Sequence, residues 1–589
     1  MCGIFGTIGS DRHAAALALS GLKDLEYRGY DSWGIAAIDE RALKIKKAVG
    51  KIGGIEKSLI TELIGNIAIG HSRWATHGAV TERNAHPHTN AGRTIAVVHN
   101  GIVENWQELK RELVGVRFVS ETDTEVIPHL IDKHVKAGLT FVEACRRSAR
   151  KLEGRFAFLA VRSGEDTLFA ARSGSPLIVG KGEGQYYLAS DVPAFLDYTQ
   201  VVNYVDDGEY VLLSQKGAQF FKLENNLEVK KNDVRIEWAK DVAKKGNFEH
   251  FMLKEILEQR ETLARSIQQD DALIERAAEK IKGSSRVLLL GCGTAGHVGE
   301  TARYFFTQIA GKQVSFVSPS EFDLYAPFIG KDTLVVAISQ SGETADVLDA
   351  VTRAKASGAS ILSVLNSRGS SLERVGDFNF LINAGPEIAV ASTKATSSQL
   401  ATLFLLAYAV RGELAKGKRI VLETVAQINE WLNPKFLEHV KRVANSLATS
   451  EHIYVIGRSY NYPIALEAAL KIQEISYIHA EGFAGGEIKH GPIALITLGT
   501  PVIALVHEGK GKADILNNIA ELRARGAYVV GISEDRHDSF DDWIHIPSGE
   551  NIAPIVSLIP MQLVAYYLAT SRLLDPDKPR NLAKSVTVR

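Results

Sequence analysis

Cysteine is scarce in this sequence, which holds three in 589 residues, Cys2, Cys145 and Cys292. An odd number of cysteines without paired spacing excludes a disulfide framework and a cysteine-rich zinc site. A chain of this size with so few cysteines is typical of a reducing compartment, so we expect it in the cytoplasm.

An excess of charge of either sign is also absent. The chain has 68 basic and 69 acidic side chains and a formal net charge of −1. Such a balance gives no bulk attraction for nucleic acid or for an anionic membrane, so any phosphate group must be bound by a local site. We therefore expect small-molecule partners and neither nucleic acid nor membrane.

The sequence lacks an uninterrupted hydrophobic run of membrane-spanning length. Its most apolar long stretch, residues 552–570, contains Pro554, Ser557, Pro560 and Gln562, and the beginning MCGIFG has no signal-peptide hydrophobic region. This pattern predicts neither a membrane span nor a targeting segment.

What is present indicates several domains, because one domain usually takes about 100–200 residues. Up to about Leu223 short apolar runs alternate with tight turns, which predicts a β-rich domain over residues 1–239. Residues 240–250 (KDVAKKGNFEH) are polar and aperiodic, as in a linker. Beyond them, apolar runs such as VLLLG and TLVVAIS alternate with helical stretches, which predicts parallel α/β sheets.

The second half repeats itself. Residues 345–348 (ADVL) recur 168 positions later as 513–516 (ADIL), Gly358-Ala359 recurs at the same offset, and Gly291 after VLLL corresponds to Gly457 after IYVI. Matches that keep their order indicate two tandem α/β domains. We place them at 251–425 and 426–575, followed by a C-terminal tail, residues 576–589.

Cys2 directly follows Met1, and a small second residue normally allows methionine removal. The new terminus would hold a thiol nucleophile and an α-amine base together, with reference pKa values of about 8.5 and 7.7–8.0. The alternative, which MCG alone leaves open, is a buried structural cysteine.

Four further segments favour the nucleophile: residues 26–32 (EYRGYDS), 71–78 (HSRWATHG), 99–101 (HNG) and 120–125 (SETDTE). Together they resemble the glutamine amidotransferases of the N-terminal-nucleophile type. Hydrolysis of a carboxamide needs donors for an oxyanion, and Asn100 with Gly101 offers a side-chain amide and an unhindered backbone N–H. The nearby histidines do not predict a metal site, because the aspartate or cysteine residues that would complete a ligand set do not occur at suitable spacing around them. These histidines are His71, His77, His86, His88 and His99.

In the second half, the strand TLVVAI leads into Ser339-Gln340-Ser341-Gly342-Glu343-Thr344 and then a helical pattern. A polar loop at a helix N-terminus, at the carboxyl end of a strand, is a cradle for an anion, and its alternative is a simple turn. It resembles the phosphate loop of sugar isomerase (SIS) domains. The second repeat has HEGKG at 507–511, without hydroxyls, so we expect phosphate in the first copy alone. GCGTAG at 291–296 matches the GxGxxG spacing, but VSPS at 317–320 replaces the acidic residue of a dinucleotide site.

Two segments near the end carry candidate acid–base groups. Glu467, Lys471 and Glu474 are spaced by four and three, which puts them on one helix face, and the alternative is a solvated salt-bridge ladder. Glu481, Glu487 and His490 follow in a glycine-rich stretch, which favours acid–base chemistry.

The tail reads NLAKSVTV at 581–588 and resembles the closing segment of one enzyme family, although such an end could also fray. That family is the isomerising glutamine:fructose-6-phosphate amidotransferases, the glucosamine-6-phosphate synthases, and the resemblance covers essentially the whole chain. It implies an N-terminal-nucleophile αββα glutaminase domain followed by two tandem SIS domains with parallel sheets. It also implies that ammonia released from glutamine aminates fructose 6-phosphate, which is isomerised to glucosamine 6-phosphate in the first step of amino-sugar synthesis. The resemblance also implies that the enzyme uses no cofactor, neither pyridoxal phosphate nor a metal, and that it is a homodimer.

The resemblance also implies roles for individual residues. On the glutamine side it makes Cys2 the nucleophile, Asn100 and Gly101 the oxyanion hole, and Arg73, Trp74, Thr76, His77, Gly101 and Asp123 the pocket lining. On the sugar side it makes Glu474 the base, His490 the ring-opening residue and Lys584 the Schiff-base amine. The remaining sugar-side residues are Thr294, Ser339, Gln340, Ser341, Thr344, Val390, Ser392, Lys471 and Ala583, with Ala583 beside the ammonia path from Trp74.

Three positions depart from the family pattern: Ala295-Gly296 where Ser-Tyr is usual, Trp33 where a small residue is common, and Arg589 where the last residue is usually acidic. Two other function classes make different demands on the sequence. A fused glutaminase with a phosphoribosyl acceptor would need a phosphoribosyltransferase half in place of the repeats. A non-catalytic sugar-phosphate sensor would predict a basic DNA-binding module and would not require Cys2, Glu474, His490 and Lys584 together.

Overall fold

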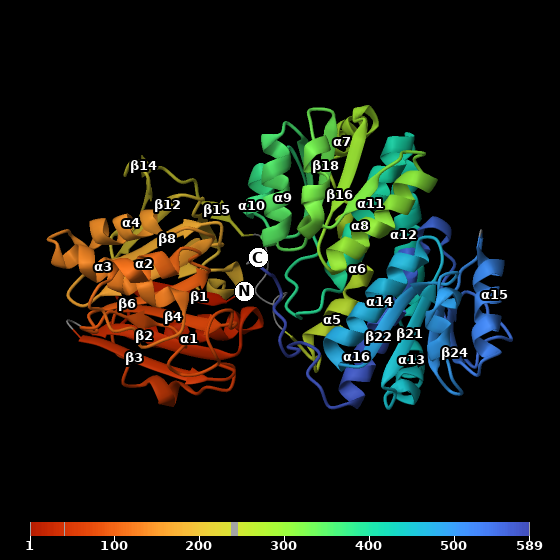
Figure 1. Ribbon diagram of the computed structural model, residues 1–589, viewed down its shortest axis with the longest axis horizontal. Helices are drawn as coiled ribbons and strands as arrows, with labels where there is room; N and C mark the ends of the chain where they lie inside the picture. Colours follow the sequence, from red (N-terminus) through yellow and green to blue (C-terminus); the bar gives the residue numbers. More distant parts are fainter. Residues whose placement is uncertain (1, 40–41, 237–244, 510, 588–589) are drawn as a thin grey trace. The chain divides into compact units, whose positions relative to one another are not determined.

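The computed structural model describes residues 2–39, 42–236, 245–509 and 511–587, in two compact units (Figure 1). Unit 1 runs from the N-terminus to about residue 243 and includes the residues from Ala583 onward, and unit 2 covers residues 244–582. Of the predicted linker 240–250, residues 240–244 lie outside the described residues. Residues 245–250 precede the first helix of unit 2 without helix or strand.

Unit 1 contains two antiparallel sheets. The first has the order β15-β11-β9-β10-β1-β4-β2-β3, and the second has the order β14-β13-β12-β8-β7-β6-β5. The strands of the first are β1 (Gly3–Gly9), β2 (Ser32–Asp39), β3 (Ala42–Val49), β4 (Ile67–Arg73), β9 (Ile178–Lys181), β10 (Gln185–Ala189), β11 (Val201–Tyr204) and β15 (Val234–Arg235). Those of the second are β5 (His88–Thr89), β6 (Ile95–Gly101), β7 (Phe156–Arg162), β8 (Leu168–Ser173), β12 (Glu209–Ser214), β13 (Gly217–Lys222) and β14 (Glu228–Val229).

The two sheets of unit 1 pack face to face, and helices cover their outer faces. Because successive side chains of a strand point to opposite faces, Ile4 of β1 packs into the core between the sheets whereas Phe5 packs under α1 (Ala14–Asp24). On the second sheet, Phe158 packs with α3 (Val126–Lys136) and α4 (Phe141–Lys151), and α2 (Trp106–Glu112) lies before them in the chain. The order of layers is αββα, as the resemblance implied.

Unit 2 contains two five-stranded parallel sheets, with the orders β17-β16-β18-β19-β20 and β22-β21-β23-β24-β25. The first has β16 (Arg286–Leu290), β17 (Ser315–Val317), β18 (Thr333–Ser339), β19 (Ser360–Leu365) and β20 (Phe378–Leu381). The second has β21 (His452–Gly457), β22 (His479–Ala484), β23 (Pro501–Leu505), β24 (Tyr528–Ser533) and β25 (Asp542–His545). The predicted pair of tandem parallel α/β sheets is therefore confirmed.

Most helices of unit 2 pack into one large apolar cluster. Phe404, Ile472 and Leu558, from three helices, belong to a single hydrophobic cluster that reaches both sheets. The helices are α5 (Phe251–Leu257), α6 (Gln259–Ser266), α7 (Asp271–Gly283), α8 (Thr294–Gln308), α9 (Ala345–Ala356), α10 (Ser371–Val375), α11 (Lys394–Arg411), α12 (Leu414–Trp431), α13 (Pro434–Leu447), α14 (Asn461–Ser476), α15 (Lys512–Arg523) and α16 (Ala553–Ser571). Of these, α9, α10 and α15 pack into two smaller clusters. The expected boundary between residues 425 and 426 lies inside α12.

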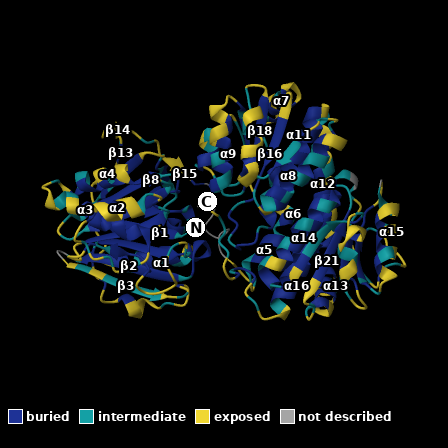
Figure 2. Cartoon of the chain, in the orientation of Figure 1, coloured by how far each residue is buried: buried dark blue, intermediate teal, exposed yellow. Residues whose placement is uncertain are grey.

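The apolar stretch near the end of the sequence forms α16. Among the described residues it is the one helix long and apolar enough to cross a membrane, but 94% of its apolar window is buried inside the protein. Figure 2 shows it coloured mainly as buried, like the central strands β1 and β18. We interpret α16 as a core helix.

Candidate functional site

Strand pairing positions Cys2. It immediately precedes β1, and Gly3 of β1 pairs with Ser72 of β4, so Cys2 lies beside the end of β4. The Trp74 N–H donates to Cys2 Sγ at 3.2 Å, and the thiol donates to the Trp74 carbonyl at 3.4 Å. A Cβ on Gly3 would lie 2.5 Å from Ser72 Oγ, so the close approach of the two strands requires glycine.

Asn100 and Gly101 end β6 next to Cys2. The Asn100 amide Nδ2 donates to the Cys2 carbonyl at 2.8 Å, and within the described chain its buried Oδ1 has no hydrogen-bond partner. Gly101 has φ +113°, and a Cβ there would lie 1.9 Å from the Arg155 carbonyl oxygen. The structure thus brings the predicted oxyanion donors to the predicted nucleophile.

The residues predicted to bind the charged groups of glutamine have contacts of their own. Arg73 is buried and donates to the carbonyls of His77, Gly78 and Ala79, which holds the loop after β4. The Asp123 carboxylate accepts from the Val103 N–H at 2.7 Å. These contacts fix both side chains, and their contact with glutamine stays a prediction. Of the other pocket candidates, Trp74 and His77 are half-buried and Thr76 is exposed.

The three cysteines differ in their surroundings. Burial raises the pKa of Cys2, against the positive N-terminus and the Trp74 N–H, which lower it. Burial raises the pKa of Cys292 to about 11, and Cys145 is fully buried in unit 1 with its pKa raised as well. A protonated Cys2 thiol needs an adjacent base before it can attack, which is the part expected of the α-amine.

The histidines near Cys2 form a buried stack. The rings of His71 and His86 lie 4.0 Å apart, and those of His86 and His88 lie 4.7 Å apart. His99 Nδ1 and Thr124 Oγ1 form a hydrogen bond of 2.8 Å, and His71 Nε2 lies 2.9 Å from the His99 carbonyl oxygen. The described residues contain no group of three metal-ligating side chains, here or elsewhere. These are packed histidines.

The stack predicts acid sensitivity of unit 1. Burial lowers the pKa of His71 and of His88 to about 3, and it lowers the pKa of His86 and of His99 too. In the unfolded chain these groups take up protons near pH 6.5, so the stability of the neutral stack is present above that pH and is lost as pH falls toward 3.

We expect the Tm of the intact chain to fall between pH 6.5 and 5, where the carboxylates of the unfolded chain are still ionised. The glutaminase activity that remains after incubation at each pH should fall over the same interval. A Tm that stays constant over that interval would contradict the prediction.

In unit 2 the loop predicted to bind phosphate, residues 339–344, follows β18. The Glu343 carboxylate accepts a hydrogen bond of 2.8 Å from the Ser371 N–H, so it caps the N-terminus of α10. Ser339 Oγ and Thr344 Oγ1 lie 3.1 Å apart. Gly342 has φ +64°, and a Cβ there would lie 2.2 Å from Ser370 Oγ, so this tight loop requires glycine. The backbone N–H groups of the first turn of α9 follow directly.

The strand order explains the place of this loop. In β17-β16-β18-β19-β20 the chain goes from β16 to β17 on one side and returns to β18 on the other. Ligands of open α/β sheets bind at such a switch point, outside the carboxyl ends of the strands. Thr294, which begins α8 after β16, and Ser339, which ends β18, lie on the two sides of it.

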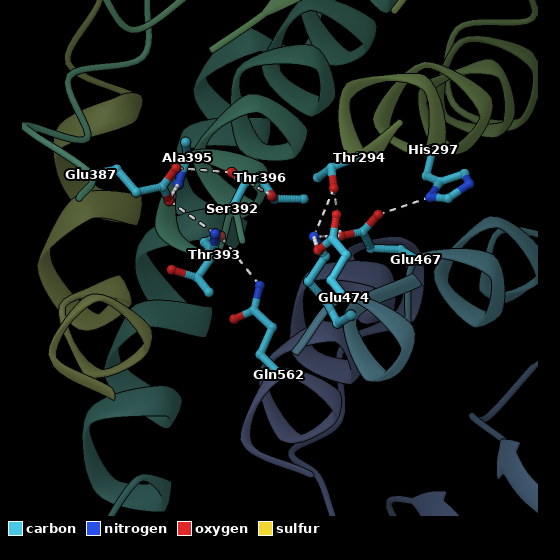
Figure 3. A network of polar contacts seen from close by, with 11 residues as sticks. Thr294, His297, Glu387, Ser392, Thr393, Ala395, Thr396, Glu467, Glu474 and Gln562 are labelled. Atoms are coloured by element: carbon cyan, nitrogen blue, oxygen red, sulfur yellow. Dashed lines mark hydrogen bonds and ion pairs between the residues drawn. The ribbon is translucent and has the colours of Figure 1, made fainter. Parts of the chain in front are cut away.

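A buried polar cluster joins α8 to α14 (Figure 3). Lys471 Nζ donates to Thr294 Oγ1 at 3.0 Å and forms a short ion pair with Glu474, three residues further along α14. Glu467 Oε1 lies 3.5 Å from Lys471 Nζ. Lys471 and Glu467 are each 1% exposed. The structure therefore brings Thr294, Lys471 and Glu474 together and rules out a solvated salt-bridge ladder.

The i, i+4 spacing of Glu467 and Lys471 predicts the place of Glu467 in this cluster, but no pattern in the sequence predicts that of His297. His297, whose Nδ1 lies 2.8 Å from Glu467 Oε2, is 170 residues away in sequence and had no local signal.

A buried carboxylate, that of Glu387, holds the loop that contains Val390 and Ser392. Glu387 accepts from Ser392 Oγ at 3.0 Å and from the N–H groups of Thr393 and Ala395 at the start of α11, as Figure 3 shows. Gln562 of α16 donates to the Thr393 carbonyl at 3.2 Å. Ser392 is thus oriented by contacts within unit 2.

The start of the tail is anchored in unit 2. The Asp577 carboxylate accepts from the N–H groups of Phe251 and Met252, each at 2.8 Å, and the Asp577 carbonyl accepts from the Val390 N–H at 3.0 Å. The Arg580 N–H donates to the Tyr477 hydroxyl at 2.7 Å, at the end of α14. Ala583 and Lys584 are half-buried and group with unit 1.

His490 is not joined to the acid–base cluster. It is exposed, in the short 3-10 helix Ile488–His490, and its N–H donates to the Glu487 carbonyl at 2.9 Å. Among the described contacts of Glu474 and Lys471 none involves it.

Two of the three departures from the family pattern lie in described parts of the chain. Ala295 and Gly296 lie in the first turn of α8, where a Cβ on Gly296 would lie 3.0 Å from the Gly291 carbonyl oxygen. Trp33 is buried in the core under α1. Arg589 lies outside the described residues.

Comparison with known proteins adds the following similarities. A SIS domain model matches residues 280–409 and 446–572, and a glutamine amidotransferase domain model matches residues 71–197. The glutamine–fructose-6-phosphate aminotransferase (isomerizing) of Clostridium tetani is 43% identical over 615 aligned positions, and that of Pyrococcus horikoshii is 42% identical over 598. Both alignments cover 100% of each chain. The solved C-terminal domain of glucosamine-fructose-6-phosphate aminotransferase from Francisella tularensis is 32% identical with a TM-score of 0.53, and covers 57% of this chain and 99% of that one.

Proposed function

The chain belongs to the isomerising glutamine–fructose-6-phosphate aminotransferases, and we propose that it performs their reaction with Cys2 in unit 1 and Lys471, Glu474 and Lys584 on the sugar side. It hydrolyses glutamine to glutamate and transfers the ammonia to fructose 6-phosphate with ketose–aldose isomerisation, giving glucosamine 6-phosphate. The observation that carries the residue assignment is the cluster in which buried Lys471 contacts half-buried Thr294 and Glu474.

The glutaminase half begins with the Cys2 thiol. Its proton passes to the α-amine that methionine removal exposes, directly or through water, and the thiolate attacks the carboxamide carbon of glutamine. The tetrahedral oxyanion is stabilised by the Asn100 amide and the Gly101 N–H. The leaving amide nitrogen takes up a proton and departs as ammonia, and water then releases glutamate from the thioester.

Recognition of glutamine rests on groups at a distance from the thiol. The α-carboxylate is assigned to Arg73 and the α-ammonium to Asp123, because a guanidinium and a carboxylate match these charges. Trp74, Thr76 and His77 line the same pocket. Support comes from the contacts that fix Arg73 and Asp123 in buried positions.

On the sugar side, the phosphate group binds to Ser339, Gln340, Ser341, Thr344 and the N-terminus of α9. Val390, Ser392 and Thr294 contact the sugar. His490 opens the ring, and the Lys584 amine adds to C2 of the open ketose, with loss of water, to form an imine. After ammonia replaces Lys584 at C2, Glu474 takes a proton from C1 and returns it to C2, which yields the 2-amino aldose.

The phosphate loop gives a separate prediction. Ser341→Ala and Thr344→Ala should each weaken fructose 6-phosphate binding by roughly 1.5–3 kcal/mol, because each removes a hydrogen bond to a charged group. Basal glutaminase activity should stay close to that of the parent. The measurement is the Kd for fructose 6-phosphate by calorimetry.

The matched control is Thr352→Val on the same helix α9, whose hydroxyl donates to the Leu348 carbonyl and lies two turns beyond the loop. If the loop were a simple turn, both loop variants would bind the sugar as tightly as Thr352→Val does.

The remaining assignments complete the proposal. The enzyme works as a homodimer in the cytoplasm, without cofactor, and its domains are residues 1–239, 251–425 and 426–575, with a linker at 240–250 and a catalytic tail at 576–589. Ala583 lies beside the path of ammonia from Trp74. The test of the whole proposal is the formation of glutamate and glucosamine 6-phosphate in equal amounts from the two substrates. A chain that makes neither product would contradict it.

A further inference from the structure

His297 contacts the acid–base cluster from a different helix. It lies in the first turn of α8, three residues after Thr294, and its Nδ1 is 2.8 Å from Oε2 of Glu467 on α14 (Figure 3). Thr294 donates to the other oxygen, Oε1, at 3.0 Å. Two side chains of α8 thus hold both oxygens of one buried carboxylate.

The direction of the contact follows from the charge of Glu467. Burial alone would raise the pKa of Glu467, but the Lys471 charge and the contacts with His297 and Thr294 lower it. An ionised carboxylate can only accept hydrogen bonds, so Nδ1 of His297 carries the proton and donates. The side chain of His297 is 23% exposed, whereas that of Glu467 is 1% exposed.

Glu467 in turn sets the place of the Lys471 ammonium. Burial lowers the pKa of Lys471, but the two carboxylates Glu467 and Glu474 outweigh it and raise the pKa to about 12, so the group stays charged. An ammonium has three N–H donors, and the acceptors around Nζ are Thr294 Oγ1, Glu467 and Glu474. A change in the orientation of Glu467 therefore alters the ion pair between Lys471 and Glu474.

We propose that His297 is a positioning residue for proton transfer on the sugar: by donating to Glu467, it fixes Lys471 Nζ against the Glu474 carboxylate. The inference rests on the proposed role of Glu474 as the base. His297 acts through Glu467 and Lys471, so its loss should disturb the proton transfer more than the binding of the sugar.

The alternative is a contact that only holds α8 to α14. The other end of α8 offers a polar contact for comparison, because Gln308, its last residue, donates to Ser459 Oγ just before α14 at 3.0 Å. That contact does not involve Glu467 or Lys471. Gln308→Ala is therefore a matched control for a loss of helix contact.

The experiment compares His297→Leu, His297→Asn and His297→Gln with Gln308→Ala in the full chain. Asn can place an N–H where Nδ1 stands, Gln extends its amide beyond that point, and Leu has no donor. The readouts are Tm, glutaminase activity, kcat and KM for fructose 6-phosphate in synthesis, and the yield of the borohydride-trapped sugar adduct on Lys584.

We expect His297→Leu and His297→Gln to lower the kcat of synthesis about 10- to 100-fold, with KM within about 3-fold and the trapped adduct retained. His297→Asn should stay within about 5-fold of the parent, and Gln308→Ala within about 2-fold. Glutaminase activity should be unchanged in all four. If His297→Leu fails to fold, the comparison of Asn with Gln gives the same answer.

Three results would overturn the inference: parent-like kcat in His297→Leu or His297→Gln, equal kcat in the Asn and Gln variants, or an equal loss in Gln308→Ala. Failure of the proposed function looks different. If the parent enzyme itself gave no trapped adduct, the assignment of Lys584 would be wrong. If Glu474→Gln retained parent kcat, the assignment of the base would be wrong.

Discussion

Cys2→Ala should release no glutamate from glutamine, a loss of at least about 10³-fold in kcat, while the Tm and the Kd for fructose 6-phosphate stay at the parent values. The Cys2 residue contacts Asn100, which precedes Gly101, and the contacts of its thiol with Trp74 hold it in place. The residues proposed to bind the phosphate group belong to unit 2, which has its own hydrophobic core. The measurement is glutamate production alongside calorimetric sugar binding.

The other cysteines provide the control for this prediction. Cys292→Ala should leave glutaminase activity unchanged, because that half-buried thiol, with a pKa of about 11, lies in unit 2. A glutamine-mimicking electrophile should modify Cys2 and neither Cys145 nor Cys292. Labelling of Cys145 at a comparable rate, or glutaminase activity that persists in Cys2→Ala, would show that the nucleophile is another group.

Lys584→Arg should lose synthesis of glucosamine 6-phosphate by at least about 10³-fold and keep its glutaminase activity. Arginine retains the positive charge, but its guanidinium does not form the imine with the open ketose. In the parent, borohydride with fructose 6-phosphate should reduce that imine to a stable amine, detected as a mass increase on the peptide that contains Lys584. The variant should give no such adduct.

The matched control for the tail is Lys578→Arg, six residues earlier and close to the anchoring residue Asp577. It should keep both synthesis and the adduct. Removal of the residues from Arg580 onward should abolish synthesis and spare glutaminase activity, as Lys584→Arg does. Synthesis by Lys584→Arg at a rate near that of the parent would leave the tail with a structural role alone.

The sequence predicts those parts of the fold and the site that depend on local order. The alternation of apolar runs and helices fixes the parallel sheets, because parallel strands need a crossover between them. The spacing of Lys471 and Glu474 puts them on one face of α14, and the polar loop after β18 precedes a helix N-terminus. Each of these features depends on residues that are close together in the sequence.

Features that depend on distant pairing could not be read in this way. Phe5 of β1 pairs with Ala189 of β10 and with Gly70 of β4, and no local pattern specifies either register. The contact between His297 and Glu467 depends on the packing of α8 against α14, which belong to different repeats. The anchoring of Asp577 at Phe251 joins residues 326 positions apart.

The domain boundary in unit 2 shows a further limit. The repeat identifies corresponding strands and helices but says nothing of where one globular half ends. α12 continues across residues 425 and 426, and the hydrophobic cluster that contains Phe404 and Leu558 extends through both halves. One apolar cluster is common to the two α/β sheets, so composition along the chain shows no break between them.

The most direct test of the account follows the nitrogen. The full chain is supplied with fructose 6-phosphate and glutamine labelled with ¹⁵N in the side-chain amide, in the presence of unlabelled ammonium, and the product is analysed by mass spectrometry. The account predicts glucosamine 6-phosphate that carries ¹⁵N at C2, formed in equal amount with glutamate. The Cys2→Ala variant should form no product that carries ¹⁵N. Glutamate without any amino sugar, from either nitrogen source, would contradict the central claim.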